Sequence, residues 1–385
     1  MRRSTVPALL FGVVLALFGA FGQAAPHAAA APPQAAGPKA YAGIFKDNTV
    51  AVLDTATNAV IGKIPVPAGP HGIVATPDGR HVYVSSDGDS KVSVIDTASD
   101  TITATIEVGT MPHGLAITPD GRQVLAAVFG AGQVVFIDTA TNTVLGQAPV
   151  GSPHNIAITP DGRTAYVASQ TQGQTALVIL DIASRKQTGS VPLDKTPRAL
   201  NFSPDGKQLE FTLAGADAVQ VLDPATNKIA AQIGVGASPH HPLFVPGGDM
   251  SLVVAQGPGE LDVLDPAKNA LVTAVKVGDM PHWIALSPDN KTAYVTNENS
   301  NSVSVVNLGN DSVTATIPVG NAPRKIVVVP APAAQGVTAL AATGSGGQAG
   351  RGTDRALLLS LGGAALLLVT ACAVAFRAST SDAER

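Results

Sequence analysis

The sequence predicts an all-β protein, a seven-bladed β-propeller built from four-stranded blades. One observation is a unit that recurs along most of the chain and begins with Pro followed by His or Arg. The unit starts at Pro70, Pro112, Pro153, Pro197, Pro239, Pro281 and Pro323, at intervals of 42, 41, 44, 42, 42 and 42 residues. A period near 42 residues is typical of propeller blades. A second observation is that each unit holds four short apolar segments separated by turn residues, which is the strand count of one blade.

The elements of one unit follow in a fixed order. In the unit that begins at Pro70, an apolar first strand is followed by the turn Pro77-Asp78-Gly79, where Pro presets φ and Gly allows a positive φ. A second strand (HVYVSS), a third (KVSVIDT) and a fourth (TITATIEVG) come next. The third strands end in an aspartate whose carboxylate is expected to cap the following turn. These aspartates are Asp54, Asp96, Asp138, Asp181, Asp223 and Asp265.

The two ends of the repeat region complete one blade between them. Residues 41–66 contain a second, third and fourth strand but no first strand, and Arg324–Val329 (RKIVVV) is a first strand with no partner after it. We therefore expect one C-terminal strand to join three N-terminal strands and close the ring. Closure removes the exposed sheet edges that an open array would have.

The segments outside the propeller, which is predicted at residues 40–330, are typical of an exported protein. Residues 1–31 combine Arg2 and Arg3 with an apolar stretch and small residues, as in a signal peptide. An uncleaved anchor is the alternative. Residues 32–39 are predicted to be a flexible leader and residues 331–355 a linker. Residues 356–376 carry no charge and are long enough to span a bilayer, which leaves residues 377–385 as a cytoplasmic tail.

The repeat region resembles the YVTN-repeat family of seven-bladed β-propellers. Tyr294-Val295-Thr296-Asn297 is the family signature, and residues 83–86 and 166–169 are close variants of it. The resemblance covers about residues 40 to 330 and implies the propeller fold. It is less specific for function, because that family and its relatives include surface-layer proteins, lactonase-like enzymes and dehydrogenase subunits.

The C-terminal region resembles a cell-wall sorting signal of Gram-positive bacteria, in the LAxTG form read by class E sortases. The motif is Leu340, Ala341, Ala342, Thr343 and Gly344, and it precedes the apolar span and an Arg-containing tail. The resemblance implies that a sortase cuts between Thr343 and Gly344 and joins the protein to cell-wall peptidoglycan. The expected partners are thus the sortase and the peptidoglycan. Retention as a single-pass type I membrane protein is the alternative.

The candidate ligand site is a ring of basic side chains at one mouth of the central channel. One position of the repeat is occupied by His71, His113, His154, Arg198, His240, His282 and Arg324. In a propeller the first strand is innermost, so these seven positions converge on the axis. Three roles stay open: each side chain braces its own blade, the ring binds an anion more tightly as imidazoles protonate between about pH 5 and 8, or the histidines bind a metal ion.

Catalytic motifs are scarce in this sequence. It contains no H-E-x-x-H, no G-x-S-x-G and no G-x-x-x-x-G-K, and we assign neither a catalytic residue nor a cofactor. Trp283 is expected in the core or as a binding platform, and His241 as an ordinary surface residue. The net charge of −4 argues against nucleic acid as a partner.

The leading hypothesis is a monomeric, non-catalytic recognition propeller displayed on the cell wall, with an anionic glycan or a protein as its ligand. The alternative is an exported propeller enzyme, lactonase-like or dependent on a metal or cofactor, that uses the same ring of basic residues.

Overall fold

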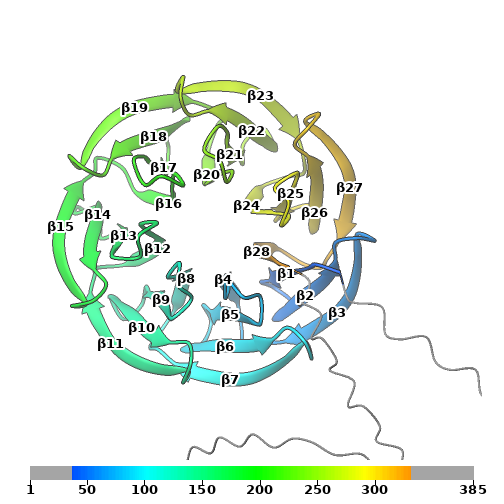
Figure 1. Ribbon diagram of the computed structural model, residues 1–385, viewed down its shortest axis with the longest axis horizontal. Coiled ribbons are helices and arrows are strands. Elements are labelled where there is room, and N and C mark those ends of the chain that lie inside the picture. Colours follow the sequence, from blue (N-terminus) through cyan, green and yellow to red (C-terminus); the bar gives the residue numbers. More distant parts are fainter. Residues whose placement is uncertain (1–36, 331–385) are drawn as a thin grey trace, which may run out of the picture. The chain divides into compact units, whose positions relative to one another are not determined.

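The computed structural model describes residues 37–330 and has seven four-stranded antiparallel sheets arranged as blades around one axis (Figure 1). The described residues form strands and turns, without a helix. This confirms the predicted all-β, seven-bladed propeller. The innermost strands of the blades are β4 (Pro70–Ala75), β8 (Pro112–Ile117), β12 (Pro153–Ile158), β16 (Pro197–Phe202), β20 (Pro239–Phe244), β24 (Pro281–Leu286) and β28 (Pro323–Val329).

The two middle strands of every blade are almost completely buried. The second strands are β5 (His81–Ser86), β9 (Gln123–Val128), β13 (Thr164–Ser169), β17 (Leu209–Leu213), β21 (Ser251–Ala255), β25 (Thr292–Asn297) and β1 (Lys39–Ile44). The third strands are β6 (Lys91–Asp96), β10 (Gln133–Asp138), β14 (Ala176–Asp181), β18 (Ala218–Asp223), β22 (Glu260–Asp265), β26 (Ser302–Asn307) and β2 (Thr49–Asp54). Apolar side chains on both faces of these strands fill the spaces between neighbouring blades, which is why the strands are nearly continuous apolar runs rather than alternating ones.

The outermost strands lie on the perimeter of the ring (Figure 1) and are mostly exposed. They are β3 (Ala59–Pro65), β7 (Thr101–Glu107), β11 (Thr143–Pro149), β15 (Lys186–Pro192), β19 (Lys228–Gly234), β23 (Ala270–Lys276) and β27 (Ser312–Pro318). In each of them a single residue near the end, such as Ile64 or Ile106, is buried against its blade. The perimeter therefore contributes little to the core.

The ring closes as the sequence predicts. The closing sheet has the order β28-β1-β2-β3, so one C-terminal strand pairs with three N-terminal ones. β28 runs antiparallel to β1, and its register places Val329 opposite Lys39 and Ile326 opposite Ala42. All seven blades lie within residues 37–330, so this part of the chain contains a complete core.

Turn residues stabilise the blades, and tyrosines of some second strands join a blade to its neighbour. Gly79 has a φ of 70°, within the left-handed range that a Pro-Asp-Gly turn requires. Asp54 Oδ1 accepts hydrogen bonds from two backbone N–H groups of its turn. These contacts confirm the predicted turn and cap roles. The tyrosine of the second strand reaches the next blade: Tyr83 donates a hydrogen bond of 2.6 Å to Asn142 Oδ1.

The predicted signal peptide, residues 32–36 of the predicted leader, the linker, the sorting motif and the tail lie outside the described residues. Among the residues that the structure describes there is no helix able to cross a membrane, and the predicted span at 356–376 is not among them.

Candidate functional site

The seven basic residues of the predicted ring lie at the start of the seven innermost strands, which surround the centre of the propeller (Figure 1). We call these residues the rim, and they are His71, His113, His154, Arg198, His240, His282 and Arg324. The expected convergence on the axis is thus confirmed for the histidines by their ring contacts, described next.

The rim is positioned by hydrogen bonds from one blade to the next. Ser85, on the second strand of one blade, donates its hydroxyl to the carbonyl oxygen of His113 in the next blade, at 2.5 Å. Thr296 does the same for Arg324, at 2.5 Å. The blades approach so closely here that a Cβ atom on Gly72 would overlap the His113 carbonyl oxygen. A side chain at Gly72 would therefore have no room beside the neighbouring blade.

The five rim histidines pack against one another. Ring centroids are 3.7 Å apart for His71 and His113, 4.0 Å for His113 and His154, and 4.3 Å for His240 and His282. These three pairs are tilted by 34° to 37°, and His282 meets His71 edge to face at 5.6 Å. The imidazoles are therefore in van der Waals contact and fill the space between them.

Hydrogen bonds divide the histidines into two groups. His113 Nδ1 donates to the carbonyl oxygen of His154 at 3.1 Å, and His154 Nδ1 lies 3.0 Å from the carbonyl oxygen of Arg198. Both contacts join neighbouring blades, as the bracing role predicts. In contrast, Nδ1 is buried without a hydrogen-bond partner in His71, His240 and His282.

The rim histidines are neutral over the pH range in which the sequence analysis expects them to charge. Burial is the main cause: it lowers the pKa values of His71, His113, His240 and His282 well below 6.5, and that of His154 to about 4. Neighbouring imidazoles and cationic side chains lower most of them further. The expectation that the rim gains charge between pH 5 and 8 is therefore wrong, because sequence reasoning treats these side chains as solvated.

The two rim arginines are half-buried and already have partners. Arg324 forms an ion pair of 2.9 Å with Glu298 and lies 4.9 Å from the centroid of the Phe45 ring. Arg198 donates a hydrogen bond of 3.1 Å to Gln256 Oε1. Both guanidinium groups thus help to hold the loops around the rim. Anion binding by the rim remains a prediction.

A second layer of side chains follows the rim directly. It consists of the residues after each rim position: Gly72, Gly114, Asn155, Ala199, His241, Trp283 and Lys325. His241 stacks on Trp283 with ring centroids 3.4 Å apart, and Lys325 Nζ lies 3.8 Å from the centroid of the Trp283 ring. Lys325 also donates a hydrogen bond of 2.5 Å to Asn155 Oδ1, across 170 residues of sequence.

The structure corrects one assignment in this layer and adds two residues to the site. His241 is only 3% exposed, so the expectation of an ordinary surface histidine is wrong. Trp283 is partly buried and lines hollows on the axis, which agrees with both roles expected for it. The sequence analysis missed Lys325 and Asn155. An alignment of the seven repeats shows both at the position directly after the rim residue, which lies near the axis in every blade.

Two hollows open beyond this second layer, with volumes of about 480 Å³ and 310 Å³. They share Leu115, Ile117, His241 and Trp283 as lining residues, and together they touch all seven innermost strands. We call the two hollows the axial funnel. Most of its wall is aliphatic, and Lys325 lines the smaller hollow. A mostly apolar hollow of this size with a few polar groups at one end is the usual form of a small-molecule site.

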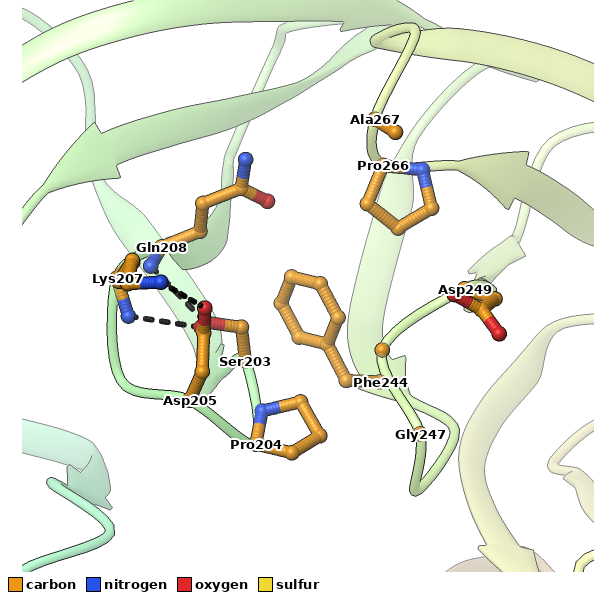
Figure 2. A pocket seen from close by; sticks show the side chains of 11 residues that line it. Ser203, Pro204, Asp205, Lys207, Gln208, Phe244, Gly247, Asp249, Pro266 and Ala267 are labelled. Carbon is orange, nitrogen blue, oxygen red and sulfur yellow. Dashed lines mark hydrogen bonds and ion pairs between the residues drawn. The ribbon is translucent and has the colours of Figure 1, made fainter.

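A further hollow of about 310 Å³ lies between the turns of two neighbouring blades (Figure 2). Phe244 and Pro266 form its apolar side. On the other side Asp205 is paired with Lys207 at 3.1 Å and accepts a hydrogen bond from Ser203. Because the polar groups of this turn already satisfy one another, the hollow is a weaker candidate than the axial funnel.

The sequence of the chain matches the model of one known protein family. The model of the cytochrome D1 heme domain matches residues 44–243, just over half of the 385 residues. The chain belongs to the cytochrome D1 heme domain family. Membership of the YVTN-repeat family, which the sequence motifs suggest, stays a prediction. No curated protein matches the sequence.

Solved structures with the same fold come from several kinds of protein. Hydrazine synthase from Kuenenia stuttgartiensis is 24% identical, with a TM-score of 0.63 over 68% of this chain and 90% of that one. A functionally unknown protein from Desulfotomaculum acetoxidans is 14% identical, with a TM-score of 0.65 over 76% and 99%. NirN, a dihydro-heme d1 dehydrogenase solved in complex with DHE, is 16% identical, with a TM-score of 0.57 over 75% and 74%. These likenesses show the fold alone.

The residues of the axis do not fit the iron-bound heme that the family name implies. Within the rim, imidazoles in van der Waals contact leave no slot for a flat macrocycle. In the axial funnel, the lining histidine is His241, and its Nδ1 accepts a hydrogen bond of 3.3 Å from the backbone N–H of Ile284. A neutral His241 therefore carries its proton on Nε2, whereas a metal-binding histidine normally donates from its other nitrogen and keeps the lone pair for the metal. Across residues 37–330, moreover, no group of three or more His, Cys, Asp or Glu side chains is placed to hold a metal ion.

Proposed function

We propose that the protein is an exported propeller that binds a small, planar and mainly apolar organic molecule in its axial funnel. The observation that carries this proposal is the funnel itself, with aliphatic walls from all seven innermost strands and His241, Trp283 and Lys325 at the end nearest the rim. The family match supports a propeller that binds a cofactor or substrate more than it supports an inert scaffold. Binding of a metal-free organic molecule also requires no metal-coordinating side chains in the rim.

The composition of the funnel sets the class of ligand. Its aliphatic walls favour a molecule with a large apolar surface, because burying such surface contributes about 25 cal/mol per Å². Among the residues that line the two hollows, Lys325 is the one with a cationic side chain. A ligand with several carboxylates would leave most of them without a partner, so we expect a neutral molecule or one with a single polar end.

The test uses Trp283, the single tryptophan of the chain. Titration of residues 37–330 with 8-anilinonaphthalene-1-sulfonate or 2-naphthalenemethanol should quench Trp283 fluorescence and saturate at one molecule per protein. Ala75 lines the larger hollow, so Ala75→Phe should fill it and weaken binding about tenfold or more, by roughly 1.4 kcal/mol.

Ala267→Phe is the matched control, because Ala267 lines the hollow of Figure 2 instead. It should leave the titration unchanged. No saturable quenching with either probe, or a loss of binding in Ala267→Phe but not in Ala75→Phe, would refute the funnel as the ligand site.

Display on the cell wall is the second part of the proposal, and it rests on the sorting motif Leu340–Gly344. Thr343→Ala should move the protein from the wall fraction to the membrane fraction, because it destroys the LAxTG motif that the sortase reads while the span at 356–376 stays intact. Fractionation followed by immunoblotting measures this shift. Equal wall attachment of the variant and the parent would leave the type I membrane alternative.

A further inference from the structure

Lys325 is a buried lysine at a position where the fold requires none. The equivalent residue is Gly72 or Gly114 in two blades and Ala199 in another. Burying an ammonium group costs several kcal/mol even after relaxation, and only 1% of Lys325 is exposed. A costly side chain that the fold does not need is a candidate for a chemical role.

Lys325 has one hydrogen-bond partner among the described residues, and the face of Trp283 is the one neighbouring group that would stabilise its charged form. Its Nζ atom donates to Asn155 Oδ1 and lies against the Trp283 ring. Among residues 37–330, no Asp or Glu oxygen lies within ion-pair distance of it. A protonated amine has three N–H donors to satisfy, whereas a neutral amine has two and a lone pair. Burial lowers the pKa of Lys325 to about 7.

No negatively charged neighbour of Lys325 opposes the effect of burial on its pKa. Its neighbours along the axis are the neutral histidines His154 and His241 and the guanidinium group of Arg324, and none of them supplies a negative charge. Lys325 nevertheless lines the 310 Å³ hollow of the axial funnel. A molecule bound in that hollow therefore contacts the Lys325 side chain.

We propose that Lys325 is an amine nucleophile that forms an imine with an aldehyde or ketone bound in the axial funnel. The Nζ lone pair attacks the carbonyl carbon, a C–N bond forms and the C=O π electrons move to oxygen. That oxygen then leaves as water with the two protons lost by the amine, and a C=N bond remains. Atoms and charge balance without an oxidant or reductant.

This inference rests on the proposed function, because the carbonyl compound must first bind in the funnel. It names the substrate class as an apolar, planar aldehyde or ketone. Asn155 holds one N–H of the amine, and so it acts as a positioning residue rather than as a reacting group.

The experiment treats residues 37–330 with 2-naphthaldehyde and sodium cyanoborohydride, which reduces an imine to a stable amine. Peptide mapping should find one lysine adduct, on Lys325, beside the adduct on the α-amino group of the chain, which has an ordinary pKa of about 7.7 to 8.0. An ordinary lysine has a pKa of about 10.4 and is almost fully protonated at pH 7, so labelling of Lys325 should be about a hundredfold faster than that of an exposed lysine such as Lys207. Lys325→Met and Lys325→Arg should lose this adduct, and Lys207→Met should keep it.

The outcomes separate the two proposals. Saturable quenching of Trp283 by 2-naphthalenemethanol, which has no carbonyl group, without any adduct on Lys325 would overturn the imine and leave the funnel as a binding site. Absence of quenching would overturn both. Labelling spread equally over exposed lysines would also overturn the imine. If Lys325→Met does not melt cooperatively, the site of the adduct in the parent protein still decides the question.

Discussion

Deletion of Arg324–Val329 should abolish the cooperative unfolding of the whole ring rather than remove one strand from it. β28 is the innermost strand of the closing blade, paired with β1 from Lys39 to Ile44. Its loss would expose the edge of β1 and remove the buried side chains of Ile326 and Val329, whose burial stabilises by about 1.5 to 3 kcal/mol each. β28 also packs against the innermost strands of both neighbouring blades, β4 and β24. The summed loss approaches the free energy of unfolding of an ordinary domain, which is about 5 to 15 kcal/mol.

Calorimetry and near-ultraviolet circular dichroism measure the effect. The deletion variant should show no sharp transition and no fixed tertiary signal at the melting temperature of the parent. A chain that ends at Pro330 and keeps β28 is the matched control and should melt like the parent. A peptide covering residues 323–330, added in excess, should restore part of the transition by pairing with β1. Melting of the deletion variant at the parental temperature would contradict the closure.

Much of this fold is readable from the sequence because one blade corresponds to one repeat. The 42-residue period, the Pro-Asp-Gly turns and the capping aspartates are local signals, and each blade repeats them. The closure is readable too, since residues 41–66 lack a first strand and Arg324–Val329 lacks the other three. Repetition also places the rim residues in one column, which is why their convergence on the axis follows from the spacing of the prolines.

The electrostatics of the site could not be read in the same way. The neutral state of His71 or His282 depends on the burial produced by seven blades packed together, and no single repeat contains that information. Lys325 and Asn155 are 170 residues apart, and their hydrogen bond exists only because the ring closes. His241 follows His240 directly and has the sequence context of a surface residue, although the axial column buries it.

The largest effect that we expect from solution conditions is a steep loss of stability in mild acid. Six buried histidines have pKa values lowered chiefly by burial: His71, His113, His154, His240, His241 and His282. As pH falls below about 6.5, the unfolded chain takes up protons on these side chains while the folded chain does not, until the pH nears the folded values, about 4 for His154. Stability is therefore present above pH 6.5 and is lost between pH 6.5 and about 4.

Groups with the opposite sign offset only part of this loss. Burial raises the pKa of Glu210 to about 7, so the folded chain takes up that proton first and gains stability as pH falls from 7 to about 4.5. Burial also raises the pKa values of Asp87 and Asp262. Each proton contributes about 1.4 kcal/mol per pH unit, so the net slope should reach roughly 4 to 7 kcal/mol per pH unit at its steepest. The midpoint of acid unfolding should then lie between about pH 4.5 and 5.5, because total stability is about 5 to 15 kcal/mol.

Urea unfolding at pH 8, 7, 6 and 5 measures the slope. The variant His71→Gln/His240→Gln/His282→Gln removes the three histidines whose Nδ1 atoms have no partner. It should lower the acid slope by about 4 kcal/mol per pH unit, which is more than half of the net slope, because three of the six histidine protons are lost. His81→Gln, at a histidine outside the ring, is the matched control for the substitution itself. The parent protein supplies an independent measurement, since the NMR signals of the rim histidines should not titrate between pH 7.5 and 5.5. Stability that rises as pH falls from 7.5 to 5.5, or rim signals that titrate in this range, would show that the imidazoles are solvated and not stacked in a closed ring.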